Sequence, residues 1–395
     1  MTTFIAPGQS GVVGDGRTDD AAAINALLAQ GGDIKIANGI YAIGSTLKIP
    51  VGSRVLGSSS VWCMLLALPT FNGPAAVSIN GGSVDAIADY FLGGLIIRTS
   101  KAGTGPPVGL FVGNDDHLLE GFGESKIADV SVQAFAINIK AQNLRQVYWE
   151  RVSTWPGAHD GSQTSGALQC LITSTGSNFC GDQDWDQCQF TADGNGNCMQ
   201  FLPNGNGAWV SGIRIGAVFY GGGATTQALF QAAQPNSVVQ DVWFTDGSQF
   251  EGPPGKQATM MQILSQASGS RVMNIHLDDV YGSGNGFRHH VLAMTQNGGT
   301  VSDLYINNNQ LAAAWAESIS LFGVDGATVI GNHFSNVQQA PNSVMFFTNC
   351  RNVAVQSNMP TITARSVRPT FASFSGCVNA TYNGASASNI SYPMP

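Results

Sequence analysis

Charged residues are scarce in this chain. Only 11% of its 395 residues are Asp, Glu, Lys or Arg, whereas soluble proteins usually contain about 25%. Helices draw heavily on Glu, Lys and Arg, so this scarcity argues against a helical bundle. Disorder is excluded as well, because 43% of the residues are hydrophobic and the formal net charge is only −8. The 49 glycines show no three-residue period, which excludes collagen.

The chain also lacks the features of nucleic-acid-binding and membrane proteins. Its 17 Lys and Arg residues are outnumbered by 25 Asp and Glu residues and form no basic stripe, so we expect no nucleic-acid partner. The longest apolar run, 61–69, is far shorter than the roughly 18 residues of a membrane helix. Residues 1–7 have neither the basic nor the apolar part of a signal peptide. We therefore expect no membrane contact, and release from the cytoplasm by a route other than secretion.

Cysteines are few, and their spacing does not indicate zinc. Seven cysteines leave at least one thiol unpaired in a monomer. Cys170, Cys180, Cys188 and Cys198 are 10, 8 and 10 residues apart, unlike the tight pairs of zinc sites. Two interpretations remain: buried free thiols on strands, or a disulfide in the region of Cys180 and Cys198. EF-hand, HExxH and phosphate-loop motifs are missing too, so we expect no metal and no cofactor.

The abundant residue types are Gly, Asn, Ser, Thr and Val, which suit short strands joined by many turns. The first sixty residues differ from the rest because they contain one helix pattern. Gly14-Asp15-Gly16 predicts a turn, and Asp19-Asp20 offers N-cap oxygens to a helix over 21–30. Gly31-Gly32 then ends the helix in left-handed backbone. We interpret this segment as a cap over the open end of a sheet structure.

This segment resembles the pectate-lyase-like right-handed β-helix superfamily, in the form found in bacteriophage tailspikes and polysaccharide depolymerases. The resemblance covers about sixty residues and rests on residues 14–20 (GDGRTDD), Gly39-Ile40-Tyr41 and Val55-Leu56-Gly57. Ala37 stands where the family usually has proline. The resemblance implies an all-β fold, a right-handed parallel β-helix (solenoid) with an N-terminal capping α-helix. On this basis we expect a cap over 1–60, β-helix coils over 61–378 and a C-terminal tail or last coil over 379–395.

The same resemblance implies a function. It predicts a depolymerase that binds and cleaves a bacterial surface polysaccharide (capsule, exopolysaccharide or O-antigen), assembles as a homotrimer and belongs to the virion as part of a phage tail. Only about ten residues precede the motif, so no large virion-attachment domain is expected. The protein would then attach through another phage tail protein, unless the chain is a fragment.

A repeated apolar triplet supports the same architecture independently. Seven triplets follow one another at steps of 29, 33, 29, 24, 25 and 25 residues, within the range of stacked repeats. Stacking coils about 4.8 Å apart buries an apolar face that one coil cannot bury alone. Successive side chains of a strand point to opposite faces, so we expect the first and third residues of each triplet to point inward and the middle one outward. The triplets begin at Ile213, Val242, Ile275, Leu304, Thr328, Val353 and Val378.

The middle residues of successive triplets form an outward-facing row. This row predicts a carbohydrate-binding face, because sugar rings stack on aromatic side chains and polar groups bind their hydroxyls. Ordinary surface residues or a subunit interface would explain the same pattern. A shift of one residue would bury the row. The predicted substrate-binding residues are Arg214, Trp243, His276, Tyr305 and Asn307, with Trp185 from an earlier coil.

Acidic residues close to these triplets are the candidate catalytic groups. Glycoside hydrolysis needs two carboxylates, about 5–5.5 Å apart for retention or 6.5–9.5 Å for inversion. An alternative is structural: polar residues four positions after the start of each triplet, such as Asp279, Asn308 and Asn332, would stack as a ladder that satisfies backbone groups at a turn. Residues 182–186 also suit a solvated turn. The candidates are Asp246, Glu251, Asp278 and Asp279, with Asp182, Asp184 and Asp186 as a second cluster.

Two other functions stay open. A polysaccharide lyase or epimerase would use a cation and a proton-abstracting group, for which Arg214, His276 and Tyr305 are suitable. His289-His290 could join that set, although a surface histidine pair is more often incidental. The remaining alternative is a non-catalytic glycan-binding fibre protein.

Overall fold

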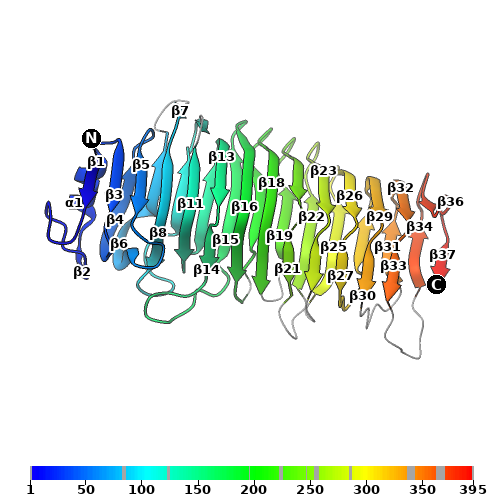
Figure 1. Cartoon of the computed structure of the whole chain (residues 1–395). Coiled ribbons are helices and arrows are strands. Elements are labelled where there is room, and N and C mark those ends of the chain that lie inside the picture. The colour runs from blue at the N-terminus through cyan, green and yellow to red at the C-terminus, as the bar shows by residue number, and fades with distance from the viewer. Residues whose placement is uncertain are drawn as a thin grey trace. The chain divides into compact units, whose positions relative to one another are not determined.

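The computed structural model describes residues 2–81, 86–121, 125–194, 196–221, 226–245, 247–252, 258–283, 287–335, 343–361 and 370–393. The candidate Asp246 lies outside these residues. The chain divides into two units, 1–196 and 197–395. In the part of the chain described, short strands dominate and one helix, α1 (Ala21–Leu28), is present near the N-terminus (Figure 1). The predicted all-β fold is confirmed.

In unit 1 the strands form parallel stacks, each strand pairing with its equivalent one coil later. The first stack contains β1 (Thr2–Ile5), β3 (Asp33–Ile36), β5 (Arg54–Gly57), β8 (Phe91–Thr99), β11 (Lys126–Gln133), β13 (Leu144–Glu150) and β16 (Phe179–Ala192). The second contains β2 (Asp15–Asp19), β4 (Gly39–Ile49), β6 (Cys63–Asn80), β9 (Val108–Gly113), β12 (Ile137–Gln142) and β15 (Leu168–Thr175). Three short strands, β7 (Ala86–Ala88), β10 (Leu119–Gly121) and β14 (Ser153–Trp155), extend these pairings.

In unit 2 the equivalent strands of successive coils form three parallel stacks. The first runs through β18 (Trp209–Gly221), β20 (Val238–Phe244), β23 (Arg271–Asp278), β26 (Thr300–Asn307), β29 (Asp325–Ile330), β32 (Arg351–Gln356) and β35 (Thr381–Tyr382). The second joins β18 to β21 (Gln249–Glu251), β24 (Tyr281–Ser283), β27 (Gln310–Ala312), β30 (His333–Ser335) and β33 (Met359–Thr361). The third contains β17 (Met199–Asn204), β19 (Thr226–Ala232), β22 (Ala258–Ser265), β25 (Phe287–Thr295), β28 (Ile319–Phe322), β31 (Ser343–Thr348) and β34 (Thr370–Ser375). Two strands, β36 (Ala385–Ser386) and β37 (Ser391–Pro393), add antiparallel pairs.

The helix α1 forms as predicted but ends earlier, and only one of the two predicted caps is correct. Asp19 accepts hydrogen bonds from the backbone N–H groups of Ala21 (3.0 Å) and Gly44 (2.8 Å). Asp20 does not cap the helix. Its buried carboxylate accepts instead from the backbone of Val13 (2.6 Å) and Gly14 (3.0 Å), because the turn before the helix leaves these N–H groups without backbone partners.

The triplet register is confirmed for five coils and wrong for two. The buried first residues, as predicted, are Ile213, Val242, Ile275, Leu304 and Val353. Thr328, predicted as a first residue, pairs with the middle residue Tyr305, so this triplet begins one residue earlier. The last triplet begins two residues later than predicted, because Ala354 pairs with Thr381.

A polar residue precedes most triplets for a conformational reason. Asp241, Asn274, Asp303 and Asn352 all have left-handed backbone, with φ of 53°, 54°, 52° and 52°. Asn and Asp adopt this conformation more readily than other residues that have side chains. Each such residue kinks its strand at the same place, so the kinks stack from coil to coil.

A ladder of asparagines lies inside unit 2 at the corner after the first stack. Asn309 donates to the Asn332 side-chain oxygen (2.9 Å), and Asn332 donates to Asn358 (2.9 Å). Their oxygens also accept backbone N–H groups, and Asn332 donates to the carbonyl of Ile306 (2.7 Å). The predicted structural role of Asn332 is therefore correct. The prediction that Asn308 belongs to the same ladder is wrong, because Asn308 has left-handed backbone and the ladder residue is its neighbour Asn309.

All seven cysteines are free and buried, so the disulfide alternative is wrong. Burial raises the pKa of the Cys180 thiol to about 12, and that of Cys188 to about 12 as well. Among the described residues, no group of three or more His, Cys, Asp or Glu side chains is arranged to hold a metal ion. The described part of the chain also contains no helix of the length and apolarity needed to cross a bilayer.

The ladder yields a prediction about stability. Replacing Asn332 with alanine removes the acceptor of one Asn309 side-chain N–H and of the Asn309 backbone N–H, and it removes a donor from the Ile306 carbonyl. We therefore expect the free energy of unfolding to fall by about 2–4 kcal/mol. Urea unfolding followed by circular dichroism measures the change. The control Asn204→Ala removes an exposed amide of β17 and should cost less than about 0.5 kcal/mol. Equal losses in the two variants would contradict the ladder's role.

Candidate functional site

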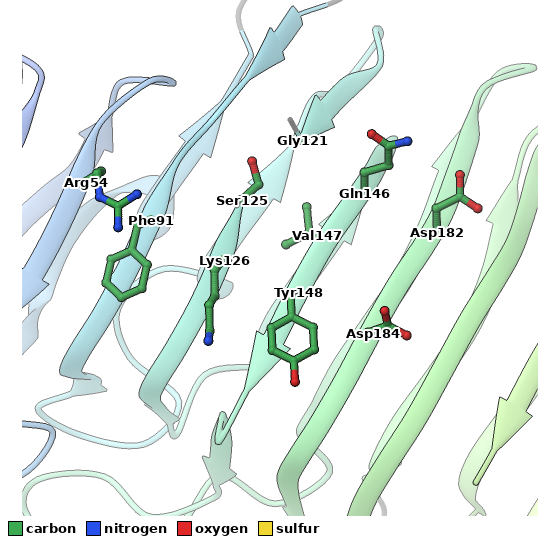
Figure 2. A pocket seen from close by; sticks show the side chains of 10 residues that line it. All are labelled: Arg54, Phe91, Gly121, Ser125, Lys126, Gln146, Val147, Tyr148, Asp182 and Asp184. Atoms are coloured by element: carbon green, nitrogen blue, oxygen red, sulfur yellow. The ribbon is translucent and has the colours of Figure 1, made fainter. Parts of the chain in front are cut away.

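An open groove of about 670 Å³ crosses the outer face of the first strand stack of unit 1. Figure 2 shows its lining side chains on successive strands. Aromatic, cationic, amide and carboxylate groups all reach it. The lining residues are Arg54, Phe91, Gly121, Ser125, Lys126, Gln146, Val147, Tyr148, Asp182 and Asp184.

One in-register row runs along this groove. Phe91 pairs with Arg54 on one side and Lys126 on the other, and Tyr148 continues from Lys126 to Asp184. The guanidinium of Arg54 lies 5.4 Å from the Phe91 ring centre, and the Lys126 ammonium lies 5.0 Å from that of Tyr148. These cation–π contacts hold the long cationic side chains along the row.

The carboxylates of the groove have different partners. Asp182 accepts from Arg145 at 2.8 Å, and this hydrogen bond raises the pKa of the arginine. Asp184 forms no hydrogen bond or ion pair with any described residue, and its side chain is exposed. Asp186, two residues further along β16, accepts from the Tyr148 hydroxyl at 3.1 Å. Burial and this hydrogen bond raise the pKa of Tyr148.

Basic side chains beside the groove are already engaged. Glu150 forms ion pairs with both Lys126 and Arg151. Arg151 also binds Asp129 at 2.7 Å, and this contact lowers the pKa of that carboxyl group. Asp184 is therefore the groove carboxylate that no cation of the described chain neutralises. Because it alternates with Asp186 on the same strand, their Cα atoms are about 6.6 Å apart.

The structure corrects the role predicted for Trp185. This side chain is 1% exposed and stacks on Trp149 inside unit 1, with ring centres 4.2 Å apart and planes at 4°. It points inward because it alternates with the outward Asp184 and Asp186. It therefore cannot contact a substrate on the outer face.

The outward row predicted in unit 2 exists. Arg214, Trp243, His276 and Tyr305 pair in register along β18, β20, β23 and β26, and all four point away from the core. The ring of His276 lies 4.3 Å from that of Tyr305, at an interplanar angle of 9°, and 5.7 Å from that of Trp243. These rings cover both faces of the imidazole, so a ligand would meet its edge.

The imidazole of His276 is held at both nitrogens. Nδ1 lies 3.3 Å from the carboxylate of Asp278, and Nε2 lies 2.9 Å from the side-chain oxygen of Asn274. Asn274 donates its own amide to Asp241, which fixes the direction of that oxygen. Asn307 donates to Asp278 at 3.0 Å.

The structure does not gather the predicted acids of unit 2 into one site. Asp278 lies in the outward row, whereas Glu251 lies on β21, in the second strand stack. Asp279 is exposed at the corner, with left-handed φ of 56°. Asp246 lies outside the described residues. Asp278 is thus the one described acid of this cluster beside the aromatic row.

The histidine pair is not on the surface, which corrects the prediction. His290 is fully buried: its Nδ1 accepts from the Ser318 hydroxyl (2.6 Å) and its Nε2 donates to the Ala312 carbonyl (3.1 Å). His289 is 8% exposed and bonds the Glu317 carbonyl at 2.8 Å. Burial lowers the pKa of His290 to about 4.

Several groove residues were missed in the sequence, among them Arg54, Phe91, Lys126 and Gln146. A signal was available for Tyr148, because Val147-Tyr148-Trp149 has the same pattern as the later triplets. Trp185 was predicted to contact sugar because it is a large aromatic residue between two acidic residues. That prediction obscured the inward–outward alternation of β16, in which Trp185 stacks on Trp149 in the core.

Comparison with known proteins identifies the fold. No family model matches the chain. A stretch of 61 residues is 39% identical to the non-secreted LysM effector LysM19 of Penicillium expansum, and this match spans only 14% of the chain and 5% of that protein. The structure resembles that of PfbA, a surface adhesin of Streptococcus pneumoniae, at 12% identity and a TM-score of 0.63, covering 96% of this chain and 92% of the other.

A second similar structure is the family 28 exopolygalacturonase of Yersinia enterocolitica. It is 12% identical, with a TM-score of 0.54, and the match covers 98% of this chain and 79% of the enzyme. These structures are pectate-lyase-like right-handed β-helices, and the chain shares their fold, as the sequence resemblance implied.

The buried histidine predicts an acid sensitivity. His290 has an ordinary pKa of 6.5 and a folded value of about 4, so the unfolded chain binds more protons between these pH values. Its contribution to stability is fully present above pH 6.5 and is lost as the pH falls to about 4, to a total of about 3 kcal/mol. His290→Gln should flatten this part of the stability profile, measured by urea unfolding at several pH values.

The matched control replaces His159, which is exposed. His159→Gln should keep the slope of the unmodified protein. If His290→Gln keeps that slope as well, the buried imidazole does not cause the acid sensitivity.

Proposed function

We propose that this protein binds a polysaccharide along the groove of unit 1 and cleaves it by glycoside hydrolysis. The observation that carries the proposal is the row of cationic and aromatic side chains that ends at Asp184, in a groove of about 670 Å³. Aromatic faces and edges suit sugar rings, and alternating charged and amide groups suit hydroxyls. The expected substrate is a bacterial surface polysaccharide, as in phage tailspike depolymerases, and the expected location is a phage tail.

The carboxylates divide into two roles. Asp184 has no donor or cation beside it, so it is free to exchange a proton with the glycosidic oxygen or with water. Asp186 accepts from the Tyr148 hydroxyl, which holds this carboxylate in place to orient the attacking water. The Cα atoms of these two residues are about 6.6 Å apart along the strand. The proposed reaction inverts the anomeric centre, which requires their carboxyl groups to lie about 6.5–9.5 Å apart.

One observation favours eliminative cleavage as a second candidate. In unit 2, His276 is positioned by Asp278 between Trp243 and Tyr305, and Arg214 lies in the same row. A uronate bound there would meet Arg214 as a cation for its carboxylate. His276 would act as the base for the neighbouring proton once its Nε2 leaves the Asn274 oxygen and gives up its own proton. Elimination creates an unsaturated uronate that absorbs ultraviolet light, whereas hydrolysis does not.

The hydrolytic assignment predicts the behaviour of one variant. Asp184→Asn should lower the rate of reducing-end release from a cleaved capsule or O-antigen polysaccharide by about 10²–10⁴-fold, because it removes a group that transfers a proton. Thermal unfolding should not change, since Asp184 is exposed and makes no bond to the described residues.

The matched control is Asp33→Asn on β3, which removes an exposed carboxylate outside the groove and should leave the rate unchanged. Unchanged cleavage by Asp184→Asn would refute the catalytic role. Binding without product from any polysaccharide of a broad panel would favour the non-catalytic fibre protein.

A further inference from the structure

A second and smaller hollow opens on the outer face of unit 1, beside the groove. Its volume is about 190 Å³, against about 670 Å³ for the groove, so it has room for a single sugar ring. Hydroxyl, amide and charged groups line it. The residues that determine its chemistry are Ser60, Asp129, Ser131, Gln133, Arg151 and Ser153. We call it the side pocket.

The side pocket and the groove are connected by one chain of ion pairs. Lys126 lines the groove, whereas Asp129, three residues later on β11, lines the side pocket. Glu150 pairs with both Lys126 and Arg151. Arg151 in turn binds the two carboxylate oxygens of Asp129, at 2.7 and 2.8 Å. The charges of this chain therefore balance, and the two cavities lie about 10 Å apart along the strand.

The direction of this displacement decides which part of a polysaccharide enters the side pocket. The groove row passes from strand to strand, from Arg54 to Asp184 (Figure 2). A main chain bound along that row runs across the strands. The side pocket lies off this line, in the direction of the strands, so a branch that leaves the main chain reaches it and the main chain does not.

The uncharged groups of the side pocket suit the hydroxyls of a neutral sugar. Ser131 and Gln133 point outward because they alternate with buried valines on β11. Gln133 donates to the Ser131 hydroxyl at 2.7 Å, which leaves that hydroxyl free to donate its own hydrogen. Ser60 and Ser153 form no side-chain hydrogen bond with any described residue, so both hydroxyls are available to a ligand.

An exposed tryptophan lies at the rim of the side pocket. Trp155 follows Ser153 by two residues on β14, so both side chains point to the same face. It also pairs in register with Gln133 of the pocket lining. Trp155 is 42% exposed, although it is large and apolar. An accessible indole beside hydroxyl groups offers the apolar face of a sugar ring a surface on which to stack.

We infer that the side pocket binds a single neutral sugar that branches from the main chain in the groove, so that the protein selects a branched polysaccharide. This inference rests on the proposed binding of a polysaccharide in unit 1 and adds the class of substrate. Trp155 stacks on the branch, and Ser60, Ser131 and Ser153 bind its hydroxyls. Binding the branch fixes the position of the main chain relative to Asp184, because contacts remote from the scissile bond can orient it.

The first experiment compares a cleaved polysaccharide with the same polysaccharide after exoglycosidases have removed its side branches. The unmodified protein should cleave the branched form with a kcat/KM about 10–100-fold higher, as two or three additional hydrogen bonds predict. Ser153→Leu fills the side pocket and should lower kcat/KM for the branched form to that for the debranched form, without changing the latter. Equal cleavage of the two forms by the unmodified protein would overturn the inference.

Two further variants guard against misfolding as the cause. Trp155→Ala introduces no clash and should lower kcat/KM about fivefold for the branched form alone, because it removes the stacking surface. Ser177→Leu adds the same apolar side chain at an exposed turn outside both cavities and should leave both values unchanged. Loss of cleavage of both forms in Trp155→Ala would contradict a role in selecting the branch.

The second experiment measures binding without cleavage and so separates the side pocket from the hydrolysis. Saturation-transfer NMR of the full chain with methyl glycosides of common neutral sugars should show transfer to at least one of them. Ser153→Leu should abolish this transfer, whereas Asp184→Asn should keep it, because Asp184 is not part of the side pocket. If the unmodified protein binds none of these sugars, the inference is wrong even where Asp184→Asn confirms the hydrolysis. Transfer that Ser153→Leu abolishes in a protein that cleaves no polysaccharide would support the side pocket and refute the hydrolysis alone.

Discussion

In-register parallel pairing between successive coils is the constraint on which the rest of this structure depends. Backbone hydrogen bonds between coils fix which residue lies above which. Lys126 and Tyr148, 22 positions apart, and Tyr148 and Asp184, 36 positions apart, thus become neighbours. An inward row then builds the core and the alternate row faces outward. The pairing register alone determines which outward side chains of adjacent coils are neighbours. The groove of unit 1 follows from this register.

Parallel pairing leaves some buried backbone groups without hydrogen-bond partners, and polar side chains of the chain supply these partners. Corners and kinks leave backbone groups without partners, and side chains supply them: Asp20 at the N-terminal turn, Asn332 in the ladder and His290 between two coils. The sequence predicted structural roles for Asp20 and Asn332, whereas His290 was a candidate member of the lyase set. Each is explained by an unsatisfied backbone or hydroxyl group nearby.

The parts that could be predicted from the sequence are those where alternation is clean. Ile213, Val242, Ile275 and Leu304 each begin a triplet after a kink residue, with apolar first and third residues and Arg, Trp, His or Tyr in the middle, and their register was correct. The register failed at Thr328, since Ala327 to Ile330 contains no charged residue to mark the outward side. The groove could not be assembled from the sequence either, because the pairing of Arg54 with Phe91 spans a segment with no clear triplet.

The uneven length of the coils has an evolutionary consequence. Val242 lies 33 residues before its partner Ile275, whereas Leu304 lies only 23 before its partner Ala327, and yet both pairs stack in register. Extra residues are thus absorbed at the corners without disturbing the neighbouring turns. Such a scaffold can gain or lose loop sequence freely, so recognition by the loops can diversify rapidly while the framework beneath them stays the same.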